Sequence, residues 1–302
     1  MAPAAAVAAS ASAQTATEAA RPAPAGADAI SSGSAARADE DPFGSLPWEA
    51  MRREHLGDGP LRFDASVRVQ APPFAEDPRN VPLRFSVPGL RHGPKPDERV
   101  GERAGDRGGK RGVEPEVERV VVLVDRNPIR RVLSFEPIAV LPSLAFSFRL
   151  EQASPVRVAV RGRDGRWRVG GTWVESAGGG CTVSGTTRAD GSWPRTLGQV
   201  GARLFPVSPD PAAAARLRLR VMHPMDTGLV DGIPAFHLQR LELQEAGGRV
   251  LMRLSLGEPV SENPVFSIDL VDRPRGPLRL LGHDNNGNRI DQWIGAGTAD
   301  PP

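Results

Sequence analysis

One residue in the sequence combines a strong nucleophile with a setting that suits presentation to another protein. Cys181, the only cysteine among 302 residues, follows the consecutive glycines Gly178, Gly179 and Gly180. A thiolate can hold a sulfane sulfur or a mixed disulfide. Glycines, having no Cβ, let the backbone extend into a narrow cleft. These residues predict a covalent carrier group, Cys181, on a thin glycine arm, 178–180. The alternatives are a buried structural cysteine and an exposed thiol that is not used.

Two other clusters contain groups that bind metals elsewhere. His223 and Met225 would lie on one face of a strand and could suit Cu(I). Alternatively, Pro224 ends the strand and Met225 packs in the core. The run 283–291 resembles a calcium loop, with oxygen-bearing side chains at 284, 286 and 288, but it lacks the glutamate of a full one, and a hairpin turn at Asn286-Gly287 explains it more simply. We therefore predict no metal site and no cofactor.

No arrangement of residues indicates an enzyme. The sequence has no Gly-x-Ser-x-Gly nucleophile elbow, and His55, His92 and His237 are dispersed. The run 125–128, Asp-Arg-Asn-Pro, is typical of a turn in which Asp and Asn bond nearby backbone. We predict a carrier or accessory protein with no catalytic residues.

Charge and hydropathy exclude two classes of partner. The formal net charge is only +2, and acidic residues alternate with arginine along most of the chain. Basic residues do not form a stripe with exposed aromatic residues, so we expect no nucleic acid. Apolar runs stay well short of the roughly 18–20 residues that span a bilayer, so we expect no membrane partner.

The elements that must position these residues are strands. Frequent Gly and Pro separate short β-branched runs, which favours an all-β fold of two immunoglobulin-like β-sandwich modules in tandem. Alternating apolar and polar residues predict strands at 65–70 and 81–87 and another that starts at 216. The run 117–124, apolar apart from Glu118 and Arg119, predicts a central strand buried on both faces, and residues 49–55 predict a short helix. We place the first module at 46–181 with a flexible insertion at 91–112, a linker at 182–212, and the second module at 213–302.

Residues 1–45 are rich in Ala, Ser and Gly, and we expect a disordered tail. An alternative is the remnant of a signal peptide, because Ala11-Ser12-Ala13 precedes Gln14 in a small-x-small cleavage pattern. Export of the chain would place it in the periplasm.

The motifs and their order resemble SoxY fused to SoxZ, the two subunits of the sulfur carrier of thiosulfate oxidation. In the first module, the turn 125–128 and Gly179-Gly180-Cys181 are similar to SoxY. In the second, the run 222–228, Met-His-Pro-Met-Asp-Thr-Gly, is similar to a SoxZ motif. The resemblance is closest to fused SoxYZ-like carriers found beside quinoprotein dehydrogenases. One departure is that the SoxY arm ends its chain, whereas here Thr182 and a second module follow.

The resemblance implies a periplasmic carrier that holds a sulfur-containing or thiol-reactive group on Cys181. Its partners would be periplasmic oxidoreductases, either sulfur-oxidation enzymes or a quinoprotein dehydrogenase. It also implies that His223 and Met225 lie at the interface between the modules. Fusion removes the need for a heterodimer, so we expect a monomer. The alternative function is a non-covalent accessory module of a quinoprotein (PQQ-dependent) dehydrogenase.

Overall fold

The structure is a computed structural model, and it describes residues 40–88, 117–189, 191–206 and 208–295. The expectations for the tail at 1–39 and for the insertion at 91–112 lie outside the described residues. The described part contains no helix that is both long and apolar enough to cross a membrane. All described residues belong to one compact unit.

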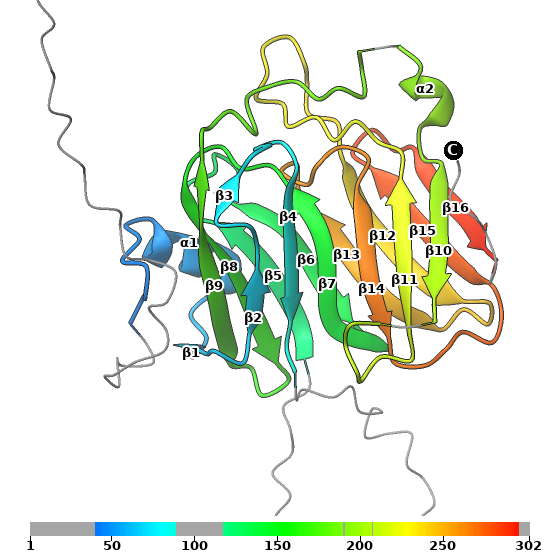
Figure 1. The fold of residues 1–302 in the computed structure, drawn as a ribbon, viewed down its shortest axis with the longest axis horizontal. Coiled ribbons are helices and arrows are strands. Elements are labelled where there is room, and N and C mark those ends of the chain that lie inside the picture. Colours follow the sequence, from blue (N-terminus) through cyan, green and yellow to red (C-terminus); the bar gives the residue numbers. More distant parts are fainter. Residues whose placement is uncertain (1–39, 89–116, 190, 207, 296–302) are drawn as a thin grey trace, which may run out of the picture. The chain divides into compact units, whose positions relative to one another are not determined.

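Strands dominate both modules (Figure 1). The first module contains α1 (Trp48–Leu56), β1 (Leu61–Phe63), β2 (Arg68–Gln70), β3 (Phe74–Ala75), β4 (Val81–Ser86), β5 (Val117–Val124), β6 (Arg131–Pro137), β7 (Val140–Phe148), β8 (Ser154–Gly162) and β9 (Trp167–Ser176). The remainder contains α2 (Trp193–Thr196), β10 (Val200–Phe205), β11 (Ala215–Val221), β12 (Leu238–Glu245), β13 (Val250–Leu256), β14 (Val265–Leu270), β15 (Leu278–Asp284) and β16 (Arg289–Ile294). The predicted all-β fold class is confirmed.

The strands of the two modules pair with each other, so each sheet runs through both. Within the described residues, the larger sheet has ten strands, in the order β1-β9-β8-β5-β6-β13-β12-β15-β16 with β3 beside β9. The smaller has six, in the order β10-β11-β14-β7-β4-β2. Antiparallel pairing joins the modules twice, at β6–β13, where Phe135 faces Leu254, and at β7–β14, where Leu144 faces Ile268.

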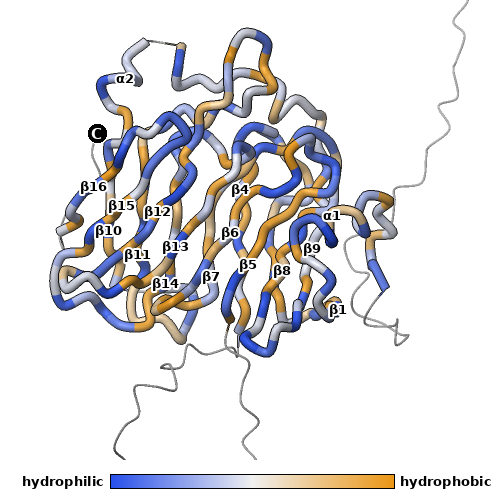
Figure 2. The backbone as a smooth tube through the Cα atoms, turned by 180° about the vertical axis from the view of Figure 1, so that it is seen from behind, coloured by the Kyte–Doolittle hydropathy of each residue, from blue (hydrophilic) through white to orange (hydrophobic). Residues whose placement is uncertain are grey.

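One apolar core fills the space between the sheets and draws on both modules. A second, smaller cluster lies outside the larger sheet, where Trp48 and Met51 of α1 cover Val121 and Leu123 of β5. Because Val120, Val122 and Val124 face the main core, the apolar part of β5, 120–124, is buried on both faces as predicted, whereas Glu118 and Arg119 before it are exposed. Figure 2 shows this strand as one of the most hydrophobic in the molecule.

Three expectations differ from the structure. Order begins before residue 46, because Asp41 makes hydrogen bonds of 2.6 and 3.0 Å to the buried Arg157, whose guanidinium lies 4.9 Å from the Phe43 ring centroid. The strand expected at 65–70 is confined to β2, since residues 65–66 form a turn. The linker expected at 182–212 contains β10, which pairs along its whole length with β11.

Candidate functional site

Cys181 lies in the segment between β9 and α2, which crosses one end of the two sheets beside the loop between β11 and β12 (Figure 1). It packs on residues 149–151, which follow β7. The Glu151 carboxylate accepts hydrogen bonds from the backbone N–H of Cys181 at 2.8 Å and from the Thr182 hydroxyl at 2.9 Å. The thiol Sγ lies 3.8 Å from the carbonyl oxygen of Arg149.

The glycines before Cys181 fit the chain closely to its neighbours. A Cβ on Gly180 would collide with the carbonyl oxygens of Pro78 and Leu150. Gly178 and Gly179 have φ of 99° and 83°, which residues with side chains rarely adopt. The glycine run therefore allows a tight turn and a close approach of backbones, where the sequence suggested an extended arm.

Burial of Cys181 is complete, since its exposed fraction is 0%. The expectation that three glycines would keep this thiol exposed is therefore wrong. Burial raises the pKa of the Cys181 thiol to about 12; the negative charge of Glu151 adds to the rise, and Arg149 opposes it. In this conformation the group is a protonated, poorly nucleophilic thiol at neutral pH.

A buried arginine, Arg149, connects residues 177–188, which we call the cysteine segment, to both modules. Its guanidinium donates to the carbonyl oxygens of Gly180 at 3.3 Å, Val183 at 3.4 Å and Met225 at 3.4 Å. Only 1% of the residue is exposed. Burial lowers the pKa of Arg149, and the charge of Glu262 is the largest effect that counteracts it. A buried charge is costly unless it is compensated, so Arg149 needs these acceptors. Its hydrogen bonds thereby hold the end of β7, the cysteine segment and the chain at Met225 together.

The loop 223–228 of the second module covers the cysteine from the other side. The Thr227 hydroxyl donates to the Cys181 carbonyl oxygen at 2.7 Å. Met225 is fully buried with φ of 49°, and its carbonyl oxygen is the one that accepts from Arg149. The structure thus places this loop, with Met225, against the cysteine segment.

His223 instead packs inside the second module. Its ring lies 4.4 Å from that of Phe236, and its Nε2 is 3.5 Å from a carboxylate oxygen of Asp284. Burial lowers the pKa of His223 to about 4, although Asp284 opposes this shift, so the ring is neutral at pH 7. Its Nδ1 accepts from the Met225 N–H at 3.1 Å.

The side chains considered as metal ligands form hydrogen bonds within the protein. The Met225 thioether accepts from the Leu238 N–H at 3.4 Å. One Asp284 carboxylate oxygen accepts from the N–H groups of Asn286 and Asn288, both at 2.9 Å, which closes the hairpin between β15 and β16. Across the described ranges no group of three or more His, Cys, Asp or Glu side chains is placed to hold a metal ion.

The chain beyond Cys181 is also held down. The Glu262 carboxylate accepts from the backbone N–H and hydroxyl of both Thr186 and Thr187. Burial raises the pKa of Glu262, but these hydrogen bonds outweigh it and hold the pKa below its usual range. Arg188 pairs with Asp226 at 2.6 Å. The cysteine segment therefore lies docked on both modules.

Sequence reasoning missed the residues that hold this segment, namely Arg149, Glu151 and Glu262. One signal was available in the turn 125–128. The Asn127 side chain donates to the Arg149 carbonyl oxygen and accepts from the Glu151 N–H, both at 2.8 Å. Besides forming a turn, Asn127 thus fixes the backbone on which Cys181 packs.

Two family models match the chain in tandem. Residues 109–181 match the model of the family "Sulfur oxidation protein SoxY", and residues 207–293 match that of "Sulphur oxidation protein SoxZ". The sulfur carrier protein SoxY from Chlorobium limicola f thiosulfatophilum aligns at 16% identity and a TM-score of 0.32, over 43% of this chain and 96% of that one. A tetra-tandem repeat of a large adhesion protein aligns at 10% identity and a TM-score of 0.20, over 78% of this chain and 49% of that one. No curated protein matches the chain.

The two family matches stand in tandem and define a non-enzymatic carrier or accessory protein of sulfur oxidation. The chain is a fused SoxYZ-like protein, in which a SoxY segment precedes a SoxZ segment. This confirms the resemblance to SoxY fused to SoxZ and the prediction that the protein is not an enzyme. The SoxY match ends at Cys181, directly after the three glycines.

Proposed function

We propose that this protein is a periplasmic sulfur carrier that holds a sulfur-containing group covalently on Cys181. The observation that carries the proposal is the position of the cysteine. It is the only cysteine in the chain, and it lies at the end of the SoxY match, where the SoxZ loop 223–228 meets it. Sulfur-oxidation enzymes of the oxidoreductase class would load and unload it.

The buried thiol requires a conformational step. Joining the thiol to a second sulfur-bearing molecule, R–SH, forms an S–S bond and releases two protons and two electrons, which a partner oxidoreductase would accept. The resting thiol has a pKa of about 12 and is 0% exposed, so it would react only after the cysteine segment lifts. The fold would thereby protect the group from adventitious oxidation between encounters.

Mass spectrometry tests this proposal directly. The intact protein, purified from its native host without reductant, should carry an added mass that reductant removes and that peptide mapping places on Cys181. The Cys181→Ser variant should fold, carry no adduct and fail to support sulfur oxidation in that host. A wild-type protein that never carries an adduct, together with full complementation by Cys181→Ser, would rule the carrier function out.

The burial of Cys181 favours keeping one other candidate, a non-covalent accessory module of a quinoprotein dehydrogenase that needs no thiol. That function predicts co-purification with the dehydrogenase and no effect of Cys181→Ser on the complex. Loss of function in Cys181→Ser would exclude it.

A further inference from the structure

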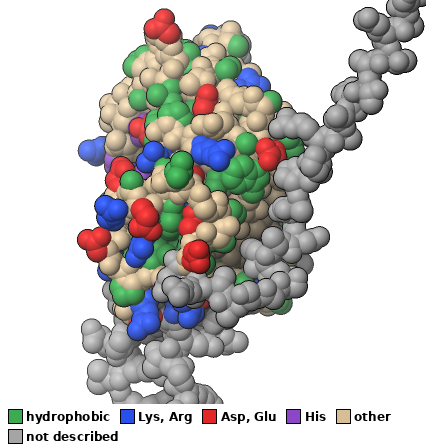
Figure 3. All heavy atoms as spheres, turned by 90° about the vertical axis from the view of Figure 1, so that its left-hand side faces the viewer, with side chains coloured by type: hydrophobic (Ala, Val, Ile, Leu, Met, Phe, Trp, Pro, Cys, Tyr) green, Lys and Arg blue, Asp and Glu red, His purple; other side chains and the backbone are tan. Residues whose placement is uncertain are grey.

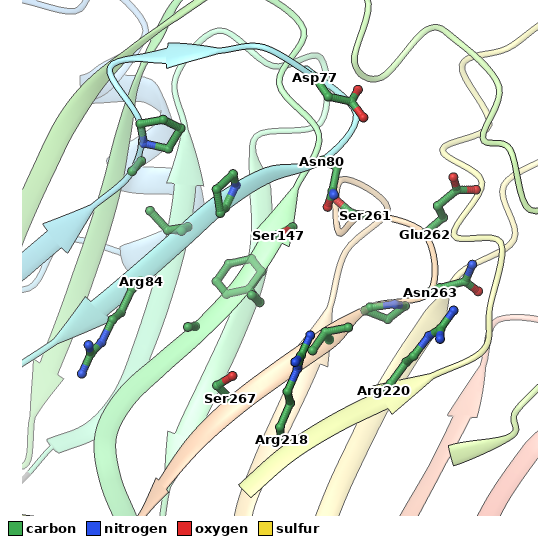
Figure 4. Close-up of a pocket in the computed structure, with 18 of the residues that line it drawn as sticks. Asp77, Asn80, Arg84, Ser147, Arg218, Arg220, Ser261, Glu262, Asn263 and Ser267 are labelled. Atoms are coloured by element: carbon green, nitrogen blue, oxygen red, sulfur yellow. The ribbon is translucent and has the colours of Figure 1, made fainter. Parts of the chain in front are cut away.

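A groove runs over the outer face of the smaller sheet (Figure 4). Its volume is about 1270 Å³. The two middle strands, β7 and β14, provide a floor of short side chains, including Ala145, Ser147 and Ser267. The long side chains of β4 and β11 rise on either side. We call this feature the arginine groove.

Strand β11 supplies most of the positive charge. Arg216, Arg218 and Arg220 alternate with buried residues and therefore share the outer face. Arg216 is neutralised, since its guanidinium bonds the Asp269 carboxylate at 2.7 and 2.8 Å. Arg218 and Arg220 are exposed and form no ion pair with any residue that the structure describes. The wall therefore carries two uncompensated positive charges.

This charge distribution differs from that of the face in Figure 3. On the side of the molecule that Figure 3 shows, acidic and basic side chains are interspersed. In the groove, Asp77 and Glu262 lie at the end nearest the cysteine segment, and Arg84, Arg218 and Arg220 lie along the rest (Figure 4). Asp77 pairs with Arg79 at 3.2 Å. Glu262 keeps its negative charge, because Thr186 and Thr187 give it hydrogen bonds but no positive charge. Arg218 and Arg220 outnumber this one carboxylate. Arg84 shares the Asp269 carboxylate with Arg216, so the net positive charge of the groove comes from Arg218 and Arg220.

The dimensions suit a polypeptide better than a small anion. Arg218 faces Ser267, which faces Ala145, which faces Arg84, so the walls stand three strand spacings apart. That is roughly 14 Å, from about 4.8 Å per spacing. The groove is also larger than the roughly 300–1,000 Å³ of small-molecule sites. An extended chain laid on the short side chains would have arginines on both sides.

We propose that the arginine groove docks an extended acidic segment of a partner protein, with its carboxylates on Arg218 and Arg220. The groove reaches the cysteine segment at Thr186, so a partner bound there lies beside the chain that covers Cys181. The proposal concerns a non-covalent surface and stands whether or not Cys181 carries sulfur.

Fluorescence anisotropy with a labelled oligoglutamate peptide tests the groove on the full-length protein. A peptide of about ten residues spans roughly 33 Å when extended, longer than the run of arginines. We expect Arg218→Glu/Arg220→Glu to weaken its binding at least about tenfold, because like charges would face the peptide. Arg218→Gln/Arg220→Gln should weaken it less. The matched control is Arg273→Glu/Arg275→Glu, an equal charge change at two exposed arginines in the loop between β14 and β15. Circular dichroism verifies folding of each variant.

Each outcome decides the proposal. Selective loss in the β11 variants supports it. Equal loss in the control variant shows binding to overall charge and overturns it. Displacement of the peptide by sulfate but not by chloride at equal ionic strength would indicate a small-oxyanion site, and it also overturns the proposal. Unchanged binding in the Arg218→Glu/Arg220→Glu variant also overturns it. Loss of Cys181 adducts in Cys181→Ser has no bearing on these measurements, so the two proposals fail separately.

Discussion

At the scale of single residues, the chemistry of this protein is governed by the surroundings of Cys181. The thiol is the group that the sequence singles out, yet its neighbours decide what it can do. Glu151 binds the backbone around it, Arg149 ties that backbone to Met225, and Thr227 closes over its carbonyl oxygen. The pKa of about 12 follows from burial first and from Glu151 second.

The raised pKa of Cys181 predicts a loss of stability in alkali. Unfolding returns the thiol pKa to about 8.5, so above that pH the unfolded state gives up a proton that the folded state keeps. The free energy of unfolding should therefore fall by about 2 kcal/mol between about pH 8 and about pH 10 in the wild type relative to Cys181→Ser. Urea denaturation of both proteins at the two pH values measures the difference.

Few other groups interfere with this measurement. The chain has no tyrosine, and its only lysines are Lys95 and Lys110, so little else titrates in that range. Cys181→Ser serves as the control because it does not titrate there. Parallel pH profiles for the two proteins would contradict a buried thiol.

The sequence identifies the reactive residue but not its environment, for a physical reason. Residue type and the preceding glycines mark Cys181 locally. Its burial depends on Arg149, about thirty positions earlier, and on Thr227, forty-six later. A glycine run is compatible with a free arm and with close backbone packing, and only the neighbours of Gly180 decide between them.

At the scale of elements, the strands that the sequence missed are those with weak alternation. Strand β6 has four consecutive buried residues, Val132 to Phe135, and lies just after the turn 125–128. Strand β10 has only a short alternating run. The strands predicted correctly, such as β4 and β11, alternate clearly between buried and exposed side chains. Strand β6 pairs with β13 of the second module. Without β6, the sequence did not predict that the two modules share a sheet there.

The cysteine segment behaves as an element whose docking Gly180 permits. Gly180→Ala would place a methyl group against the carbonyl oxygens of Pro78 and Leu150, so the segment should lift. We expect Cys181 to react with a thiol reagent such as DTNB at least about tenfold faster at pH 8, equivalent to ~1.4 kcal/mol in the free energy of opening. The melting temperature should fall as well.

The control for this experiment is Gly276→Ala, since nothing lies within 4 Å of a Cβ at that position. Both variants remove one glycine, so any general effect on the unfolded chain is matched. A labelling rate for Gly180→Ala equal to that of the control would mean that the segment does not need close packing at Gly180 to cover the thiol.

At the scale of the whole molecule, the two modules share both sheets and one core. Phe135 of β6 faces Leu254 of β13, and both are fully buried. Such a junction differs from two independent domains joined by a flexible linker, because separating the modules would expose the apolar interior of each. The fusion of the two families in one chain thus produces one folded unit over the described residues.

That architecture predicts cooperative unfolding across the family boundary. Leu254→Ala, in the second module, removes buried methyl groups at the junction and should cost about 2–5 kcal/mol. If the modules unfold together, β5 and β8 of the first module should lose as much protection as β12 of the second. Hydrogen exchange followed by mass spectrometry measures this strand by strand. Ser255→Ala, at the exposed neighbouring position, should leave both modules unchanged. Loss of protection confined to the second module would show instead that the shared sheets do not couple the two halves energetically.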